Sequence, residues 1–119
     1  MKTIKEISDE LSVSAYTIRF YEKEGLLNIP RNDRGIRDFD QHSIEVLKAL
    51  LHYRNAGVAL GDIKKMFANY DNHEYVQSLL LETKKELELK MAEMQATMKF
   101  LDYKIGLKCE LLGMKGSVG

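Results

Sequence analysis

The chain contains 119 residues, of which 45% are apolar, which is enough for about one globular domain with an appended element. No basic leader precedes an apolar run and no stretch of about 18 apolar residues occurs, so we expect a cytoplasmic protein without a membrane partner. The single cysteine, Cys109, cannot form an internal disulfide, which agrees with a reducing compartment. The 18 basic and 18 acidic residues give zero formal charge, so composition alone does not indicate a nucleic-acid partner.

The first predicted helix begins at Thr3, because Thr3 and Glu6 have the spacing of a capping box. Ile4, Ile7 and Leu11 recur at helical spacing and form its apolar face. The two residues after Leu11 are expected to end it.

A second helix is predicted in the stretch SAYTIRFYEKEGLL, with Ser14 as its N-cap and Gly25 as its stop. Two short helices joined by so tight a turn form a helix-turn-helix, in which the second helix can be presented outward. Ile18 and Tyr21 are expected to face inward. The opposite face is predicted to be exposed, aromatic and basic, with Tyr16, Arg19, Phe20 and Lys23. An ordinary solvated helix surface is the alternative interpretation.

The following stretch, NIPRNDRGIRDF, predicts a short two-stranded hairpin. Pro30 disfavours helix, and turn-forming residues including Asn32 and Gly35 are flanked by apolar residues on both sides. Arginines cluster near the predicted tip, and such a hairpin is a wing that can reach along a phosphate backbone: Arg31, Arg34 and Arg37. Residues 14–37 hold five basic and three acidic side chains, a local net charge of +2.

Two more helices are predicted before residue 70. Residues 41–56 carry apolar residues at helical spacing and are followed by Gly57, and residues 60–67 have a second apolar face. Arg54 and the backbone at 57–60 are interpreted as a second, smaller wing. Breakers at residues 70–73 close this domain, which we place at residues 1–70.

The last long segment has the 3.5-residue repeat of a coiled coil over 26 residues, or roughly 39 Å of helix. Only Lys84 is polar in this stripe, whose apolar members are Leu80, Leu87, Met91, Met94, Met98, Leu101 and Ile105. We expect a second copy of the chain to cover it, giving a homodimer, and packing onto the chain's own first domain is the alternative. The dimerisation helix is placed at residues 74–107 and a short tail at 108–119.

Taken together, the motifs SVSAYTIRFYEKEGLL, PRNDRGIRDF and LLHYRNAGVALGDIKKMF resemble the MerR family of bacterial transcriptional regulators over roughly the first 67 residues. The resemblance implies a mostly α fold, with a winged helix-turn-helix DNA-binding domain followed by a long dimerisation helix in an antiparallel coiled coil. It also implies a homodimer that binds double-stranded promoter DNA and distorts it so that RNA polymerase can engage both promoter elements.

The same resemblance implies roles for individual residues. Arg19, Arg34 and Arg37 would bind phosphates, and the first turn of the second helix would lie closest to base edges. The full set of expected DNA-contacting residues is Ser14, Ala15, Tyr16, Thr17, Arg19, Phe20, Tyr21, Arg34, Gly35, Arg37 and Arg54. The chain departs from the family pattern where tyrosines are frequent, at Phe20, Ile36 and Phe39, and each change removes a hydroxyl that could reach the DNA backbone.

Metal-sensing relatives use paired cysteines, whereas Cys109 stands alone and the three histidines have no ligand spacing, so we expect no metal and no cofactor. The tail MKFLDYKIGLKCELL resembles members that respond to electrophiles, but His52 stands where several of those have a cysteine. Cys109 is interpreted as an apolar filler, with thiol sensing as the alternative.

Two other functions compete with DNA-binding regulation. The long helix could pair with a different chain in a protein-interaction module that has lost DNA binding, an alternative that the zero net charge and the absent wing tyrosine favour. An enzyme is not expected, because no nucleophile, base and orienting group occur in a recognisable arrangement.

Overall fold

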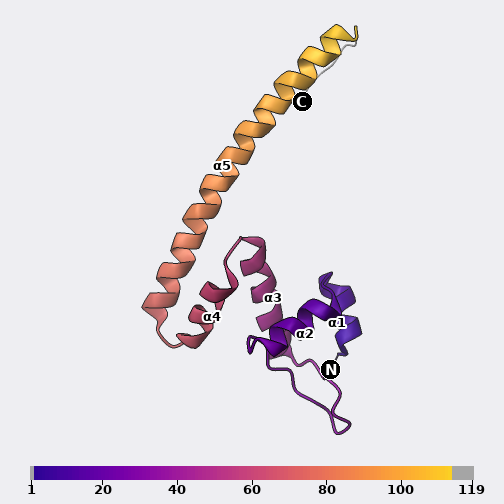
Figure 1. The fold of residues 1–119 in the computed structure, drawn as a ribbon, viewed down its shortest axis with the longest axis vertical. Helices are drawn as coiled ribbons and strands as arrows, with labels where there is room; N and C mark the ends of the chain where they lie inside the picture. Colours follow the sequence, from indigo (N-terminus) through magenta and orange to yellow (C-terminus); the bar gives the residue numbers. More distant parts are fainter. Residues whose placement is uncertain (1, 114–119) are drawn as a thin grey trace. The chain divides into compact units, whose positions relative to one another are not determined.

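The computed structural model describes residues 2–113, and within them the chain is helical apart from its turns and one long loop (Figure 1). The helices are α1 (Ile4–Leu11), α2 (Ala15–Lys23), α3 (Gln41–Asn55), α4 (Leu60–Ala68) and α5 (His73–Leu111). The chain forms two compact units, Met1–Val76 and Gln77–Gly119. None of the helices in residues 2–113 is both long and apolar enough to cross a membrane.

The turn between α1 and α2 follows from three local features. The capping box at the start of α1 is complete, with the Thr3 hydroxyl accepting from the Glu6 amide and the Glu6 side chain accepting from the Thr3 amide. Ser12 ends α1 in the left-handed conformation, with φ of 53°. The Ser14 hydroxyl accepts from the Thr17 amide at 3.1 Å and caps α2. The predicted helix-turn-helix is confirmed.

One hydrophobic core holds the first unit together. Ile7 of α1, Ile18 of α2, Leu47 and Leu50 of α3, and Ile63 of α4 are completely buried in it. Each helix therefore contributes the apolar face that its 3.6-residue periodicity predicts. The inward face of α2 is fixed by Ile18, so its opposite face is turned to solvent.

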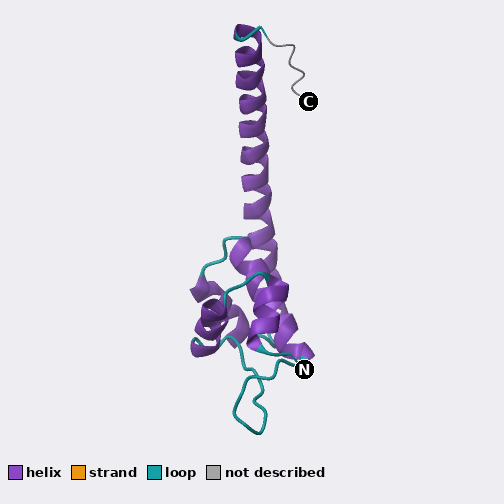
Figure 2. Cartoon of the chain, turned by 90° about the vertical axis from the view of Figure 1, so that its right-hand side faces the viewer, coloured by secondary structure: helices purple, strands orange, loops and turns teal. Residues whose placement is uncertain are grey.

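The segment between α2 and α3 is a loop and not the expected two-stranded hairpin (Figure 2). Within the described residues there are only isolated antiparallel bridges, one joining Arg31 to Arg37 and one joining Lys2 to Phe39. The strand prediction was wrong because Asn32 uses its side chain to close the turn, accepting from the amides of Arg34 and Ile36. We call residues 30–38 the wing loop.

The start of α3 is fastened to the segment before the wing loop. Asp40 caps α3 by accepting from the Ser43 amide at 2.8 Å. The Ser43 side chain, and after it this amide, lower the pKa of the Asp40 carboxyl below its usual value of 3.8 by hydrogen bonding. The buried Ser43 hydroxyl donates to the Asn28 carbonyl at 3.3 Å. Gly57 follows α3 with a φ of 84°, a conformation that glycine adopts readily.

The helix α5 is unbroken over 39 residues, or about 58 Å at 1.5 Å per residue. The amide of Tyr75 donates to the Asn72 side chain at its start. The helix was expected at residues 74–107 and here begins at His73 and ends at Leu111, so it includes the first residues of the expected 108–119 tail. Residues 114–119 of that tail lie outside the described part. No residue of α5 is buried.

Candidate nucleic-acid interface

The outward face of α2 combines aromatic and basic side chains. Tyr16 is 78% exposed, and Arg19, Phe20 and Lys23 are exposed on the same face. On the inward face Ile18 is completely buried, so a rotation of α2 that hid the outward face would expose this core residue. The core thus fixes which side chains α2 presents.

Two of the arginines expected to bind phosphate are free. The side chains of Arg19 and Arg34 are exposed and make no hydrogen bond or ion pair with another residue in the described part of the chain. A guanidinium with all its donors available is suited to a phosphate, which it can bind through two parallel N–H groups. Arg19 comes from α2 and Arg34 from the wing loop, so these two charges can contact a backbone at separate points.

The first turn of α2 supplies the residues expected near base edges. The Ser14 and Thr17 hydroxyls lie 2.9 Å apart, and Ser14 also caps the helix, so both groups already have local partners. Ala15 is half-buried. Tyr16 is therefore the side chain of this turn that is most available for an external contact.

The tip of the wing loop is shaped by Asn32 and Gly35. The Asn32 side-chain oxygen accepts from the Arg34 amide at 2.9 Å and from the Ile36 amide at 3.1 Å. Gly35 has a φ of 75°, where a Cβ would be strained. The residues at the tip, including Arg34, are exposed.

Arg37 is not free like Arg19 and Arg34. Its Nη2 lies 2.8 Å and its Nε 3.0 Å from Oε1 of Glu22, and Nη2 of Arg31 lies 3.1 Å from the same oxygen. Glu22 and Arg37 are only 19% and 20% exposed at their side chains. The resemblance implied a phosphate contact for Arg37, whereas the structure pairs it with a carboxylate of α2.

Two other expected DNA contacts have different surroundings. The ring of Tyr21 belongs to the core and is only 5% exposed, so it lies away from the outward face. The Nη1 of Arg54 donates to the Val58 carbonyl at 3.0 Å, which holds the turn between α3 and α4. Arg54 is exposed and sits where a smaller second wing was predicted.

The predicted dimerisation stripe on α5 is uncovered in the single chain. All of its apolar members are exposed by 37% or more: Leu80, Leu87, Met91, Met94, Met98, Leu101 and Ile105. Exposed apolar surface of this extent is typical of protein–protein interaction sites.

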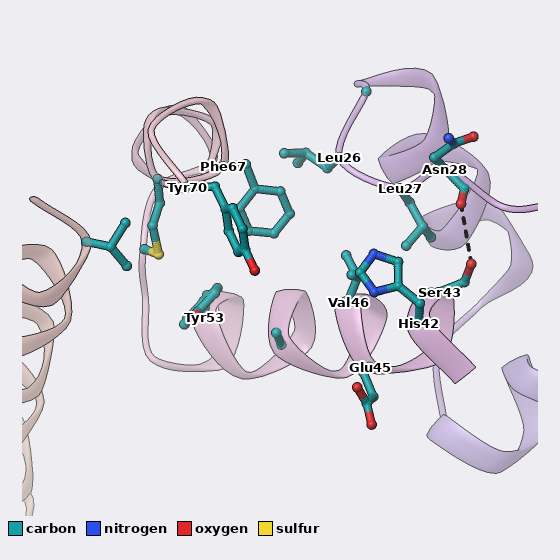
Figure 3. A pocket seen from close by; sticks show the side chains of 14 residues that line it. Leu26, Leu27, Asn28, His42, Ser43, Glu45, Val46, Tyr53, Phe67 and Tyr70 are labelled. Atoms are coloured by element: carbon teal, nitrogen blue, oxygen red, sulfur yellow. Dashed lines mark hydrogen bonds between the residues drawn. The ribbon is translucent and has the colours of Figure 1, made fainter. Parts of the chain in front are cut away.

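A separate groove lies in the first unit, between α3, α4 and residues 25–28 (Figure 3). Its volume is about 730 Å³, and its walls are mostly apolar and aromatic, with Tyr53, Phe67 and Tyr70 on one side and His42 at one end. None of the expected DNA-contacting residues lines it.

The described residues contain no group of three or more histidine, cysteine, aspartate or glutamate side chains that could hold a metal ion. Cys109 is a half-buried free thiol on α5.

The sequence did not indicate the ion pairs of Glu22, which entered the prediction only as one of the acidic charges that reduce the local basic excess. Its partners Arg31 and Arg37 lie nine and fifteen residues further along the chain. No helical or strand periodicity relates such positions, so the signal was absent from local patterns. Asn32 was predicted as a turn former, which could have indicated its bonds to the wing-loop backbone.

The fold, the outward face of α2 and the arginine-bearing wing loop define a class of protein, a regulator with a winged helix-turn-helix. Residues 2–70 match the family described as MerR HTH family regulatory protein, and the chain belongs to this MerR family of transcriptional regulators. It is 33% identical over 118 residues to an uncharacterized HTH-type transcriptional regulator of Haemophilus influenzae, with 93% of this chain and 87% of that protein covered.

Solved structures and other relatives agree with this family assignment. HiNmlR, a MerR family regulator lacking the sensor domain and crystallised bound to promoter DNA, matches with a TM-score of 0.84 and 32% identity, over 99% of this chain and 95% of that one. The regulator ZntR of Escherichia coli is 27% identical over 107 residues, covering 85% of this chain and 76% of ZntR.

Proposed function

We propose that the chain acts as a homodimer in the cytoplasm, binds double-stranded promoter DNA with the outward face of α2 and with the wing loop, and regulates transcription by RNA polymerase. The observation that carries this is the exposed ring of Tyr16 together with two arginines, Arg19 of α2 and Arg34 of the wing loop, whose side chains are exposed and unpaired within the described residues. Free guanidinium groups bind phosphates, and a side chain in the first turn of a presented helix can reach base edges.

DNA distortion is part of the proposal. Bending a site of 20–30 base pairs costs of order 1–6 kcal/mol, and this cost must be offset by contacts spread along the backbone. Two protomers joined through α5 would supply two copies of each backbone contact. We propose no enzymatic role and no cofactor.

The test is a footprint of the purified chain on DNA upstream of its own gene, with a shuffled duplex of equal length as control. Specific protection is expected, and the logarithm of the binding constant should fall linearly with the logarithm of salt concentration. Equal binding to both duplexes, or none, would contradict the proposal.

The second candidate is a protein-interaction module, which the uncovered apolar stripe on α5 also favours. Such a module would show no salt-dependent binding to promoter DNA and would form a complex with another chain in place of the homodimer.

A further inference from the structure

We propose that Glu22 is a positioning residue for the wing loop: its carboxylate holds both arms of that loop against the last turn of α2. The proposal rests on the proposed function, because the placement of the wing loop relative to α2 matters only when both contact one DNA duplex.

Arg31 and Arg37 both donate hydrogen bonds to the same carboxylate oxygen of Glu22. Oε1 of Glu22 accepts from Nη2 of Arg31 at 3.1 Å and from Nε and Nη2 of Arg37 at 3.0 and 2.8 Å. Arg31 and Arg37 face each other across the isolated bridge of the wing loop, so one carboxylate holds both arms at the same level. The outer guanidinium nitrogen of Arg31, Nη1, is also directed at the Gly35 carbonyl, at 3.5 Å.

The loop needs such a fastening because its own secondary structure is minimal. Its arms are joined by backbone bonds from the Asn32 amide to the Ile36 carbonyl and from the Asp38 amide to the Pro30 carbonyl, at 2.9 and 2.8 Å. An isolated pair of short arms has little stability in water. A charge-assisted contact that is mostly shielded from solvent is stronger than an exposed ion pair.

The consequence concerns DNA recognition. Glu22 places a negative charge beside a surface that is meant to bind phosphates, so its removal should strengthen general attraction to DNA. It should also release the wing loop, so that ordering the loop on the DNA costs binding free energy at the specific site. Opposite effects on non-specific and specific binding separate a positioning role from a simple surface charge.

Glu22→Gln removes the charge, and Glu22→Asp keeps the charge but shortens its reach by one methylene. Glu24→Gln is the matched control: Glu24 lies two residues further along, and its carboxylate pairs with Lys64 of α4 at 3.3 Å and not with the wing loop. Each variant is titrated with a duplex that the wild type selects from a random-sequence library and with a shuffled duplex.

Both Glu22 variants are expected to lower the ratio of specific to non-specific affinity about 3- to 10-fold, whereas Glu24→Gln should leave it unchanged. Glu22→Gln should in addition bind the shuffled duplex more tightly than wild type. If Glu22→Gln and Glu24→Gln raise both affinities equally, Glu22 is only a surface charge and the inference is wrong.

Hydrogen exchange in the free protein tests the fastening without DNA. The amides of Asn32 and Asp38 should exchange about 3- to 10-fold faster in both Glu22 variants than in Glu24→Gln. Unchanged exchange in both variants overturns the inference. If Glu22→Gln loses its helical circular dichroism, the exchange rates of Glu22→Asp alone serve as the test. A wild type that selects no sequence would instead contradict the proposed function, and the exchange result would still decide whether Glu22 fastens the loop.

Discussion

Tyr16 and Arg19 project from the same face of α2 but can recognise different parts of a DNA duplex. Arg19 carries a permanent charge with no partner in the described residues, which suits a phosphate. Tyr16 lies one turn earlier and is 78% exposed, and its hydroxyl can donate to or accept from a base edge.

We predict that Arg19→Ala weakens binding to all duplexes similarly and reduces the salt slope by about one unit. Tyr16→Ala should instead relax the preference at particular base pairs by roughly 1 to 3 kcal/mol. The measurement is competition binding against single-base variants of the selected site at two salt concentrations. A changed ranking of sites with Arg19→Ala, or uniform weakening with Tyr16→Ala, would mean that α2 docks in another orientation.

At the scale of elements, the turn between α1 and α2 contains a strained residue. Ser12 is the one non-glycine residue with positive φ in the described part of the chain. The left-handed conformation costs a residue with a Cβ about 1–2 kcal/mol, whereas glycine loses about 0.5–1 kcal/mol in chain entropy.

Ser12→Gly should therefore raise the free energy of unfolding by about 0.5–1 kcal/mol, measured by urea denaturation. Ser12→Ala removes the same hydroxyl without relieving the strain and should not stabilise. Equal effects of the two substitutions would show that the backbone conformation is not the cause.

The N-cap of α3 gives an element-scale prediction about pH. Hydrogen bonds from Ser43 lower the pKa of Asp40 in the folded state, so the stabilisation is complete above the ordinary carboxyl pKa of 3.8. It is lost as the pH falls through the lowered folded-state pKa.

Asp40→Asn keeps a capping oxygen but cannot titrate. The difference in Tm between wild type and Asp40→Asn, measured from pH 6 downward, should be constant above about pH 4 and shift against the wild type below it. A pH-independent difference would show that Asp40 has the same pKa in the folded and unfolded states.

At the scale of the whole molecule, the apolar stripe on α5 should join two copies of the chain. Replacing both Met94 and Met98 by lysine puts charges into the predicted seam, and this double variant should sediment as a monomer. Leu89 and Tyr103 are also more than half exposed but lie on the opposite face of a 3.5-residue repeat. Replacing these two by lysine is the control and should leave the dimer intact. Monomers in both cases, or in neither, would place the seam elsewhere on the helix.

Features that depend on neighbours within one or two helical turns were open to prediction from the sequence. The capping box at Thr3, the cap at Ser14 and the buried position of Ile18 follow from hydrogen bonds and periodicity over three or four residues. The repeat along α5 indicated a long helix with one apolar stripe for the same reason.

The tertiary structure alone decided which charges stay free. From the sequence, Arg34 and Arg37 had the same expected role, since both belong to one turn-rich segment, but of these two only Arg37 pairs with Glu22. The sequence also predicted two strands here, whereas the structure has a loop whose turn is closed by the Asn32 side chain. Pairing across fifteen residues depends on where folding brings the last turn of α2 and the arm of the wing loop, and no local propensity or period encodes that distance.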